Sequence, residues 1–260
     1  MTLFLIAALA LVQGVPASEE ATYKDCTSLV KSDAQKAVST ASAWRLRGGG
    51  SLARVCLGLA YSELGRWAPA ATAFEQAARA AETSQDPRRS DFWVQSGNAW
   101  LAADDAAKAL TAFDAALATT SLSPELRGEV HLDRARAHVA AGNLASGRAD
   151  IDKGIELVGK DPFAWYLSAA LAIREGNMAR ANADAAKSVT LAPDDPNVLL
   201  QAGTIAGTTG DIALAKQRYA QVVKLAPSSE AGRAAQAALL ASNQPAPAEA
   251  PEEEEEEEEE

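Results

Sequence analysis

Apolar and small residues recur at helical spacing in two runs between Leu57 and Ala77, LGLAYSELGRWAPAATAFEQA. Gly65 interrupts the pattern, as a residue just past a helix C-terminus does when its backbone adopts a positive φ angle. Two short antiparallel helices are therefore predicted, in which small residues let the backbones approach and large ones fill the space beside them. The pattern positions are Leu57, Gly58, Tyr61, Gly65, Ala70, Phe74 and Ala77.

The pattern returns along the chain with a period of 34 residues. Three further glycines lie in the same turn one period apart, and two pairs of prolines repeat at the same distance. A proline fits the first position of a helix or a position just beyond its end, so both pairs mark helix boundaries. The recurring residues are Gly142, Gly176 and Gly210, Pro162 and Pro196, and Pro193 and Pro227.

These helix pairs resemble the tetratricopeptide repeat, whose W-x2-LG-x2-Y...A-x3-F-x2-A...P pattern covers about 34 residues. The resemblance implies an all-α fold, a right-handed superhelical solenoid of helix-turn-helix pairs. Repeats three and four depart from the pattern, because Ile151 and Ala185 replace the aromatic residue of the second helix. In repeat three, Gly147 and Gly154 replace two alanines. Repeat two has Asp104 for the turn glycine, and aspartate tolerates a positive φ angle. About five repeats are predicted, at residues 51–84, 90–123, 128–161, 162–195 and 196–229.

Residues 1–17, MTLFLIAALALVQGVPA, contain a short apolar run followed by a site with small residues. The run is too short to span a bilayer, whereas the pattern suits cleavage by a signal peptidase. We therefore expect a signal peptide cleaved after Ala17 and a periplasmic or secreted protein. Because this segment has no lysine or arginine, an uncleaved anchor or a mispredicted start is the alternative.

Residues 18–50 are predicted to form an N-terminal helical cap, a degenerate repeat of two short helices with Asp33 as the N-cap of the second. Its closing GGG lacks the lysine and spacing of a phosphate-binding loop, which favours a turn. Cys26 in the cap and Cys56 in the first repeat are the only cysteines. Export would favour a disulfide between them, and two buried free thiols are the alternative.

The composition changes near the C-terminus. Residues 230–243 are predicted to form a capping helix, and residues 244–260 a disordered Pro-rich linker with a poly-Glu tail. The formal net charge of −11 comes mostly from this tail, because the other 251 residues carry 24 basic and 26 acidic side chains. Such a near-neutral body is unlike a nucleic-acid binder. The tail is expected either to keep the chain solvated or to contact a basic partner or divalent cations loosely.

Catalytic chemistry finds little support in the sequence. His131 and His138 share a helix face, which allows a metal site, but they occupy packing positions with no Cys or acidic ligand pattern nearby. We expect interior histidines with satisfied hydrogen bonds. The sequence contains no GxSxG, HExxH or dinucleotide-binding motif. We therefore expect no enzyme, no metal and no cofactor.

The family resemblance implies a concave groove, lined by the first helix of each repeat, that binds an extended peptide or a partner's helix. Asn98 matches the family's asparagine that binds a peptide backbone. Val94, however, stands where a carboxylate clamp has lysine, so recognition of an acidic C-terminus is not implied. Solvated residues on an inner face are the alternative. The groove positions are Val55, Leu59, Asp91, Val94, Asn98, Glu129, Leu132, Arg136, Tyr166, Ala170, Arg174, Leu200 and Thr204.

The sequence thus predicts a non-enzymatic interaction module or scaffold of the bacterial cell envelope, with a peptide or partner protein in its groove. The alternative is a membrane-tethered or self-associating structural accessory with an uncleaved N-terminus. An enzyme with an unrecognised site is a third hypothesis.

Overall fold

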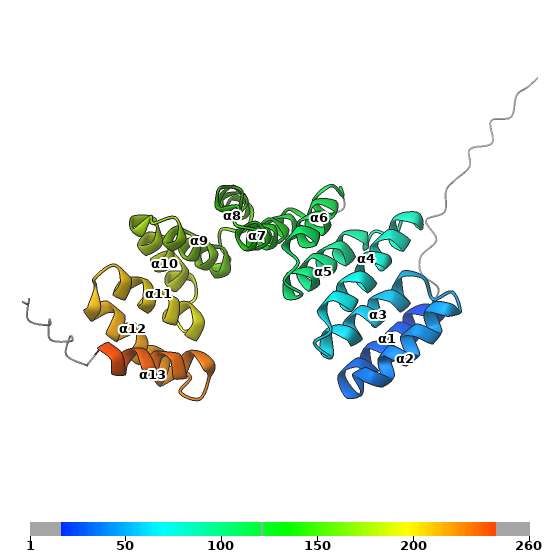
Figure 1. Cartoon of the computed structure of the whole chain (residues 1–260), viewed down its shortest axis with the longest axis horizontal. Coiled ribbons are helices and arrows are strands. Elements are labelled where there is room, and N and C mark those ends of the chain that lie inside the picture. Colours follow the sequence, from blue (N-terminus) through cyan, green and yellow to red (C-terminus); the bar gives the residue numbers. More distant parts are fainter. Residues whose placement is uncertain (1–16, 121, 243–260) are drawn as a thin grey trace, which may run out of the picture. The chain divides into compact units, whose positions relative to one another are not determined.

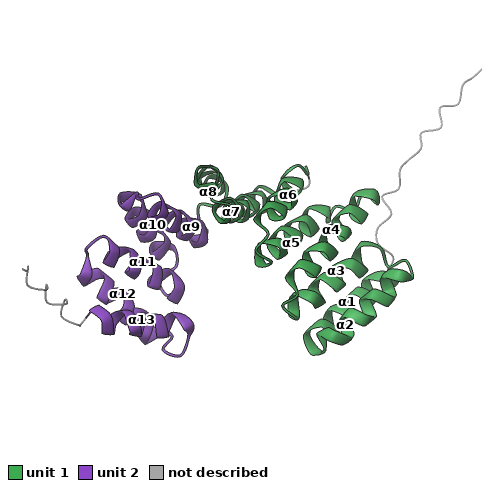
Figure 2. Cartoon of the chain, viewed as in Figure 1, with its two compact units in different colours: residues 1–159 green, residues 160–260 purple. Residues whose placement is uncertain are grey.

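The computed structural model describes residues 17–120 and 122–242, and these residues form thirteen α-helices and no strand (Figure 1). The predicted signal segment up to residue 16, the predicted linker and the poly-Glu tail lie outside the described residues. The chain divides into two compact units, residues 1–159 and 160–260 (Figure 2), and each is described by itself. None of the helices in the described residues is long and apolar enough to cross a membrane.

Unit 1 is a row of helices in which each helix packs against the next one along the chain (Figure 1). From α3 onward the helices form pairs, and we call the first of each pair an A helix and the second a B helix. The helix α4 packs against both α3 and α5, and α6 against both α5 and α7. The helices are α1 (Ala17–Ser32), α2 (Ala34–Leu46), α3 (Gly50–Glu63), α4 (Trp67–Thr83), α5 (Arg89–Ala102), α6 (Ala106–Leu117), α7 (Pro124–Ala140) and α8 (Leu144–Val158).

Unit 2 continues the same alternation with two further pairs and a final helix. The A helices are α9 and α11, and the B helices are α10 and α12. The final helix, α13, packs against α12 and α11 and so covers the end of the row. The helices are α9 (Pro162–Arg174), α10 (Met178–Leu191), α11 (Pro196–Thr208), α12 (Ile212–Leu225) and α13 (Glu230–Ser242).

The turns between A and B helices have the left-handed backbone conformation expected from the sequence. Gly65 has a φ angle of 67°, and the three other turn glycines also have positive φ angles. In the second pair Asp104 occupies this position with a φ angle of 59°, which confirms that an aspartate replaces the turn glycine. The chain reverses here because a residue in this conformation ends the helix.

Prolines and aspartates mark the starts of helices. Pro162 opens α9 and Pro196 opens α11, at the first helical position, where the missing N–H is not needed. The side chains of the preceding residues, Asp161 and Asp195, accept hydrogen bonds from backbone N–H groups of the first turn. Asp33 caps α2 in the same way by accepting a hydrogen bond from the backbone of the third residue after it.

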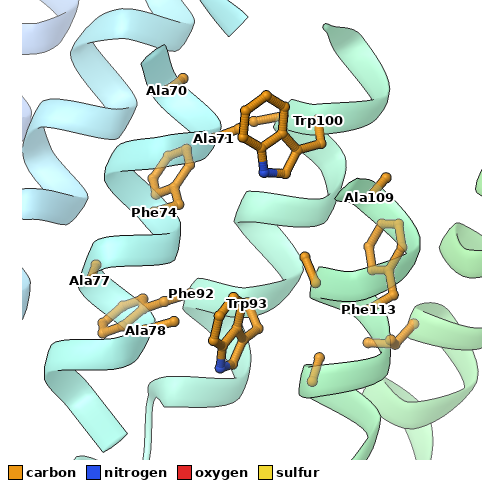
Figure 3. Close-up of a cluster of buried hydrophobic side chains, with 14 of the residues drawn as sticks. Ala70, Ala71, Phe74, Ala77, Ala78, Phe92, Trp93, Trp100, Ala109 and Phe113 are labelled. Carbon is orange, nitrogen blue, oxygen red and sulfur yellow. The ribbon is translucent and has the colours of Figure 1, made fainter. Parts of the chain in front are cut away.

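An aromatic ring of the B helix lies against a glycine of the A helix in three pairs. A Cβ atom on Gly58 would lie 2.5 Å from Cε1 of Phe74, so the ring occupies the space that a side chain would need. Figure 3 shows Phe74 and Phe113 among the alanines of the core of unit 1. The same relation joins Gly97 to Phe113 and Gly203 to Tyr219.

The first two helices are attached to α3 by a disulfide and by apolar packing. Cys26 of α1 and Cys56 of α3 form a disulfide with their Cα atoms 6.2 Å apart, and both residues are buried. Trp44 of α2 is buried in the same cluster. In addition, Arg88, which precedes α5, donates a hydrogen bond of 3.2 Å to Glu20 of α1. The N-terminal helices therefore cover the apolar end of the first pair.

Candidate functional site on the A helices

Five predicted groove residues with exposed or half-buried side chains lie on two neighbouring A helices of unit 1. Asp91, Val94 and Asn98 are on α5, and Glu129 and Arg136 are on α7. The side chains of Asp91, Glu129 and Arg136 are exposed, whereas Val94 and Asn98 are half-buried. We call the surface defined by these five residues the A-helix face of unit 1. The charged side chains of this face are exposed, so a partner protein can contact them.

The structure links two of these residues through a third that the sequence did not single out. The side-chain amide of Asn98 donates a hydrogen bond of 2.8 Å to Oδ2 of Asp133, and Nη1 of Arg136 donates one of 2.9 Å to Oδ1. Asp133 lies three residues before Arg136 on α7, and side chains at this spacing are neighbours on a helix. The sequence could therefore have predicted the contact between Asp133 and Arg136, but not the one between Asp133 and Asn98. The contact with Asn98 depends on how α5 and α7 pack.

Two of the predicted groove positions are wrong. Val55 is only 1% exposed and belongs to the apolar core of unit 1. Leu132 is 2% exposed, and a Cβ atom on Gly154 would lie 2.5 Å from its Cδ2 atom. Because Gly154 has no side chain, Leu132 packs between α7 and α8 instead of facing solvent.

A hollow of about 270 Å³ opens beside the A-helix face of unit 1. Residues of α3, α4 and α5 line it, and we call it the hollow between α3 and α5. Trp67 at the start of α4 is 40% exposed there. The side-chain oxygen of Gln95 is buried and has no hydrogen-bond partner among the described residues. Only Leu59 and Asn98 were expected from the sequence to face a ligand. The residues that line the hollow are Leu59, Ser62, Trp67, Phe74, Gln95, Asn98 and Ala99.

Unit 2 carries five of the predicted groove positions, Tyr166, Ala170 and Arg174 on α9 and Leu200 and Thr204 on α11. Arg174 is exposed and Tyr166 is half-buried. The ring of Tyr166 stacks on that of Phe163, with ring centroids 6.0 Å apart. The backbone oxygen of Tyr166 accepts a hydrogen bond of 2.9 Å from the side chain of Gln201 on α11. Gln201 thus joins the two A helices of this unit.

The two histidines belong to a polar network in the third pair. Nδ1 of His131 lies 2.8 Å from Oδ1 of Asp150, and Arg134 donates two hydrogen bonds to the same carboxylate. Nε2 of His138 lies 3.7 Å from Oδ2 of Asp150. No group of three or more potential metal ligands occurs in the described residues. His131 has the hydrogen-bonded interior role expected from the sequence, whereas the expectation of satisfied hydrogen bonds is wrong for His138, whose Nδ1 atom is buried without a hydrogen-bond partner among the described residues.

The charge of Asp150 is stabilised by its neighbours. Burial opposes ionisation of this carboxyl, but hydrogen bonds from His131 and Arg134 outweigh it, so the pKa of Asp150 is lowered. The hydrogen bond to Asp150 raises the pKa of Arg134, and a further bond to Asp114 acts in the same direction. Both carboxylate oxygens of Asp150 are thus occupied in contacts with His131 and Arg134.

Comparison with solved structures places this fold among known repeat proteins. PilW, described as a widely conserved type IV pilus biogenesis factor, has a TM-score of 0.69 at 18% identity, over 84% of this chain and 98% of that chain. The PilF protein of Pseudomonas aeruginosa has a TM-score of 0.62 at 15% identity, over 85% and 99%. YrrB, described as a TPR protein with an unusual peptide-binding site, has a TM-score of 0.50 at 14% identity, over 75% and 96%. At these identities the likeness establishes the fold.

The sequence itself matches a family model. A comparison with curated protein sequences gave no match. The model of the tetratricopeptide repeat, however, matches residues 57–124 and 132–196, which together make up more than half of the chain. Members of this family bind protein or peptide partners. The all-α helix pairs, the turn glycines and this match agree, and the chain belongs to the tetratricopeptide repeat family.

Proposed function

We propose that the protein is a non-enzymatic scaffold of the bacterial cell envelope that binds a protein or peptide partner through its A helices. The observation that carries this proposal is the hollow between α3 and α5, next to exposed charged side chains of the A-helix face. A concave, mostly apolar site with a few polar groups is the usual form of a ligand site. The peptide-binding site described for YrrB, a protein of the same fold, supports this use.

Three observations support an envelope location. The sequence begins with a predicted signal peptide, and Cys26 and Cys56 are joined in a disulfide, which oxidising compartments favour. PilW, which shares the fold, is described as a pilus biogenesis factor. The proposed partner is therefore a protein or peptide of the bacterial envelope, and the poly-Glu tail offers a second contact for a basic partner.

The experiment is in-cell crosslinking of the tagged protein, followed by mass spectrometry of what co-purifies. Charge reversal of Arg136 and Arg174, written Arg136→Glu and Arg174→Glu, changes exposed side chains on one A helix of each unit. We expect the crosslinked partner to be lost. The matched control is Lys153→Glu with Lys187→Glu, which makes the same charge change at exposed lysines on B helices. Equal recovery of the partner from both double variants would refute the proposal.

The alternative, a membrane-tethered or self-associating accessory, is separated by two measurements on the same material. N-terminal sequencing distinguishes a chain that begins after Ala17 from one that begins at Met1. The mass in solution distinguishes a monomer from an oligomer. A cleaved monomer supports the scaffold, and an uncleaved chain in the membrane fraction supports the alternative.

A further inference from the structure

We propose that the proline-rich segment of this chain, residues 244–251, binds the A-helix face of unit 2. This face is defined by Phe163 and the five predicted groove residues of the unit, which are Tyr166, Ala170, Arg174, Leu200 and Thr204. The segment follows α13 and lies outside the described residues. Its binding needs no external partner. An aromatic surface on α9, the reach of the chain and the charge of the face support it.

The A-helix face of unit 2 presents an aromatic surface to solvent. The side chain of Phe163 is 42% exposed. Its ring stacks on that of Tyr166 with an angle of 14° between the ring planes, so the two rings form one surface. Phe163, Tyr166 and Ala170 follow one another at intervals of three and four residues and therefore share one side of α9. A ligand with flat apolar groups fits such a surface.

The segment 244–251 has the chemistry that aromatic surfaces bind. It reads QPAPAEAP, with prolines at positions 245, 247 and 251. Proline-rich segments favour the extended polyproline II conformation, and aromatic-lined grooves recognise them because little conformational entropy is lost on binding. Most of the other residues in this run are alanines. Their small side chains leave the proline rings free to contact Phe163 and Tyr166.

The segment is long enough to reach this face within unit 2. Ser242 ends α13, which packs against α11, and α11 packs against α9 (Figure 2). Because neighbouring helices lie about 8 to 10 Å apart, α9 is about 20 Å from α13. Pro251 is the ninth residue after Ser242, and an extended chain of this length spans up to about 30 Å. The covalent link also keeps the segment at a high local concentration near the face.

The charge of the face suits an acidic segment. Glu249 lies among the prolines, and the poly-Glu tail follows Pro251 directly. The A-helix face of unit 2 has one charged residue, the exposed Arg174 on α9. The A-helix face of unit 1, in contrast, exposes carboxylates at Asp91 and Glu129. Like charges repel the glutamates there, so charge favours binding to unit 2.

The first test compares the full chain with a proline variant that carries Pro245→Ala, Pro247→Ala and Pro251→Ala. Isotope labelling of the four tyrosine rings gives a small set of NMR signals. We expect the ring signals of Tyr166 to differ between the two proteins, and those of Tyr219, which is buried in the same unit, to coincide. The difference should persist on dilution, because the contact is intramolecular. Identical Tyr166 signals, or a difference that disappears on dilution and so reports a second copy, would overturn the proposal.

The second test adds the peptide NQPAPAEAP, residues 243–251, to the proline variant. We expect a saturable return of the Tyr166 signals towards those of the full chain, and no return with a peptide that has alanine in place of each proline. Phe163→Ala removes one ring of the aromatic surface and should weaken peptide binding roughly tenfold. Glu129→Ala, at the exposed position one 34-residue period earlier on α7, is the matched control and should not weaken it. Equal binding to both variants contradicts the proposal.

Both tests are separate from the test of the proposed function, because neither uses an external partner. If the Tyr166 signals do not respond but the crosslinked partner is lost with Arg136→Glu and Arg174→Glu, the scaffold function stands and the binding of the segment is refuted. If the Tyr166 signals respond as expected, the segment binds this face, whatever the crosslinking experiment recovers. The first test alters no residue of the helices, so it remains decisive if Phe163→Ala does not fold.

Discussion

The ring of Phe74 lies directly over Gly58, so that a Cβ atom at position 58 would come within 2.5 Å of the ring atom Cε1. This contact holds the B helix α4 close to the A helix α3. The equivalent glycine and aromatic ring recur in the second pair at Gly97 and Phe113. The close approach of the helices therefore depends on the absence of a side chain at one residue and on the size of another.

We predict that Gly58→Ala destabilises unit 1 by about 1 to 3 kcal/mol, because the added methyl group would have to displace the ring in a well-packed core. Urea denaturation followed by tryptophan fluorescence measures the change. Gly207→Ala on α11 is the control, because its Cβ atom would lie 3.6 Å from that of Ala215, an ordinary contact. This control should stabilise α11 through the better helix propensity of alanine. Equal effects of the two variants would contradict the steric explanation.

The turn at Asp104 is predicted to be strained. Its φ angle of 59° lies in the left-handed region, which glycine adopts without a steric penalty. Asp104→Gly should therefore stabilise unit 1 by about 1 kcal/mol. Gly142→Ala, at a φ angle of 80° in the next turn, should destabilise it by a similar amount. Thermal denaturation of both variants tests the pair, and a change of the same sign in both would count against the prediction.

The Asp150 network is predicted to stabilise the third pair. Asp150→Ala removes a buried carboxylate and leaves Arg134 and His131 without that partner, which should cost about 2 to 4 kcal/mol. Asp114 also accepts a hydrogen bond from Arg134, but its side chain is 64% exposed. Asp114→Ala should therefore cost less than about 1 kcal/mol. Urea denaturation of the two variants measures the contrast, and equal losses would rule out burial as the reason.

The same network predicts a pH dependence. The pKa of Asp150 is lowered in the folded protein relative to its usual value of about 3.9, so its contribution is present above that value and is lost as pH falls through the folded pKa. The free energy of unfolding of Asp150→Asn should approach that of the wild type as the pH is lowered from about 5 to about 3. Urea denaturation across this range measures the difference. A gap that stays constant or widens at acid pH contradicts the assignment.

The disulfide is predicted to stabilise unit 1 by reducing the number of conformations available to the unfolded chain. Cys26 and Cys56 are 30 residues apart, which corresponds to about 3 to 4 kcal/mol from loop closure. Reduction of the unfolded protein before refolding should lower the melting temperature. The variant Cys26→Ala with Cys56→Ala should melt at a lower temperature than the oxidised wild type and should not respond to the reductant. Identical melting of oxidised and reduced wild type would refute this contribution.

Much of the fold was readable from the sequence because its boundaries are set locally. Gly65 and Asp104 end A helices because of their backbone conformation, and Pro162 opens α9 because it needs no hydrogen bond at that position. These local signals recur every 34 residues, and this recurrence identifies the helix pairs as repeats. The pairing of Cys26 with Cys56 could be predicted because these are the only two cysteines in the sequence.

The candidate site was harder to predict from the sequence. Groove residues were assigned from their positions in the repeat, and these positions do not show how closely neighbouring helices pack. Val55 and Leu132 occupy groove positions in the pattern but are buried in the structure. For Leu132 the reason is Gly154, whose missing side chain opens space between α7 and α8. The pattern of residues along the chain does not give the distance between α7 and α8.

By itself, the sequence determined the helix pairs, their turns and the family, because backbone conformation and periodicity act over a few residues. The tertiary structure decided which polar groups meet: Asp133 joins Asn98 to Arg136, and Asp150 joins His131 to Arg134. It also decided that the oxygen of Gln95 is buried beside a hollow without a donor among the described residues. These contacts join different helices, and the side-chain volumes in the core set the spacing between helices.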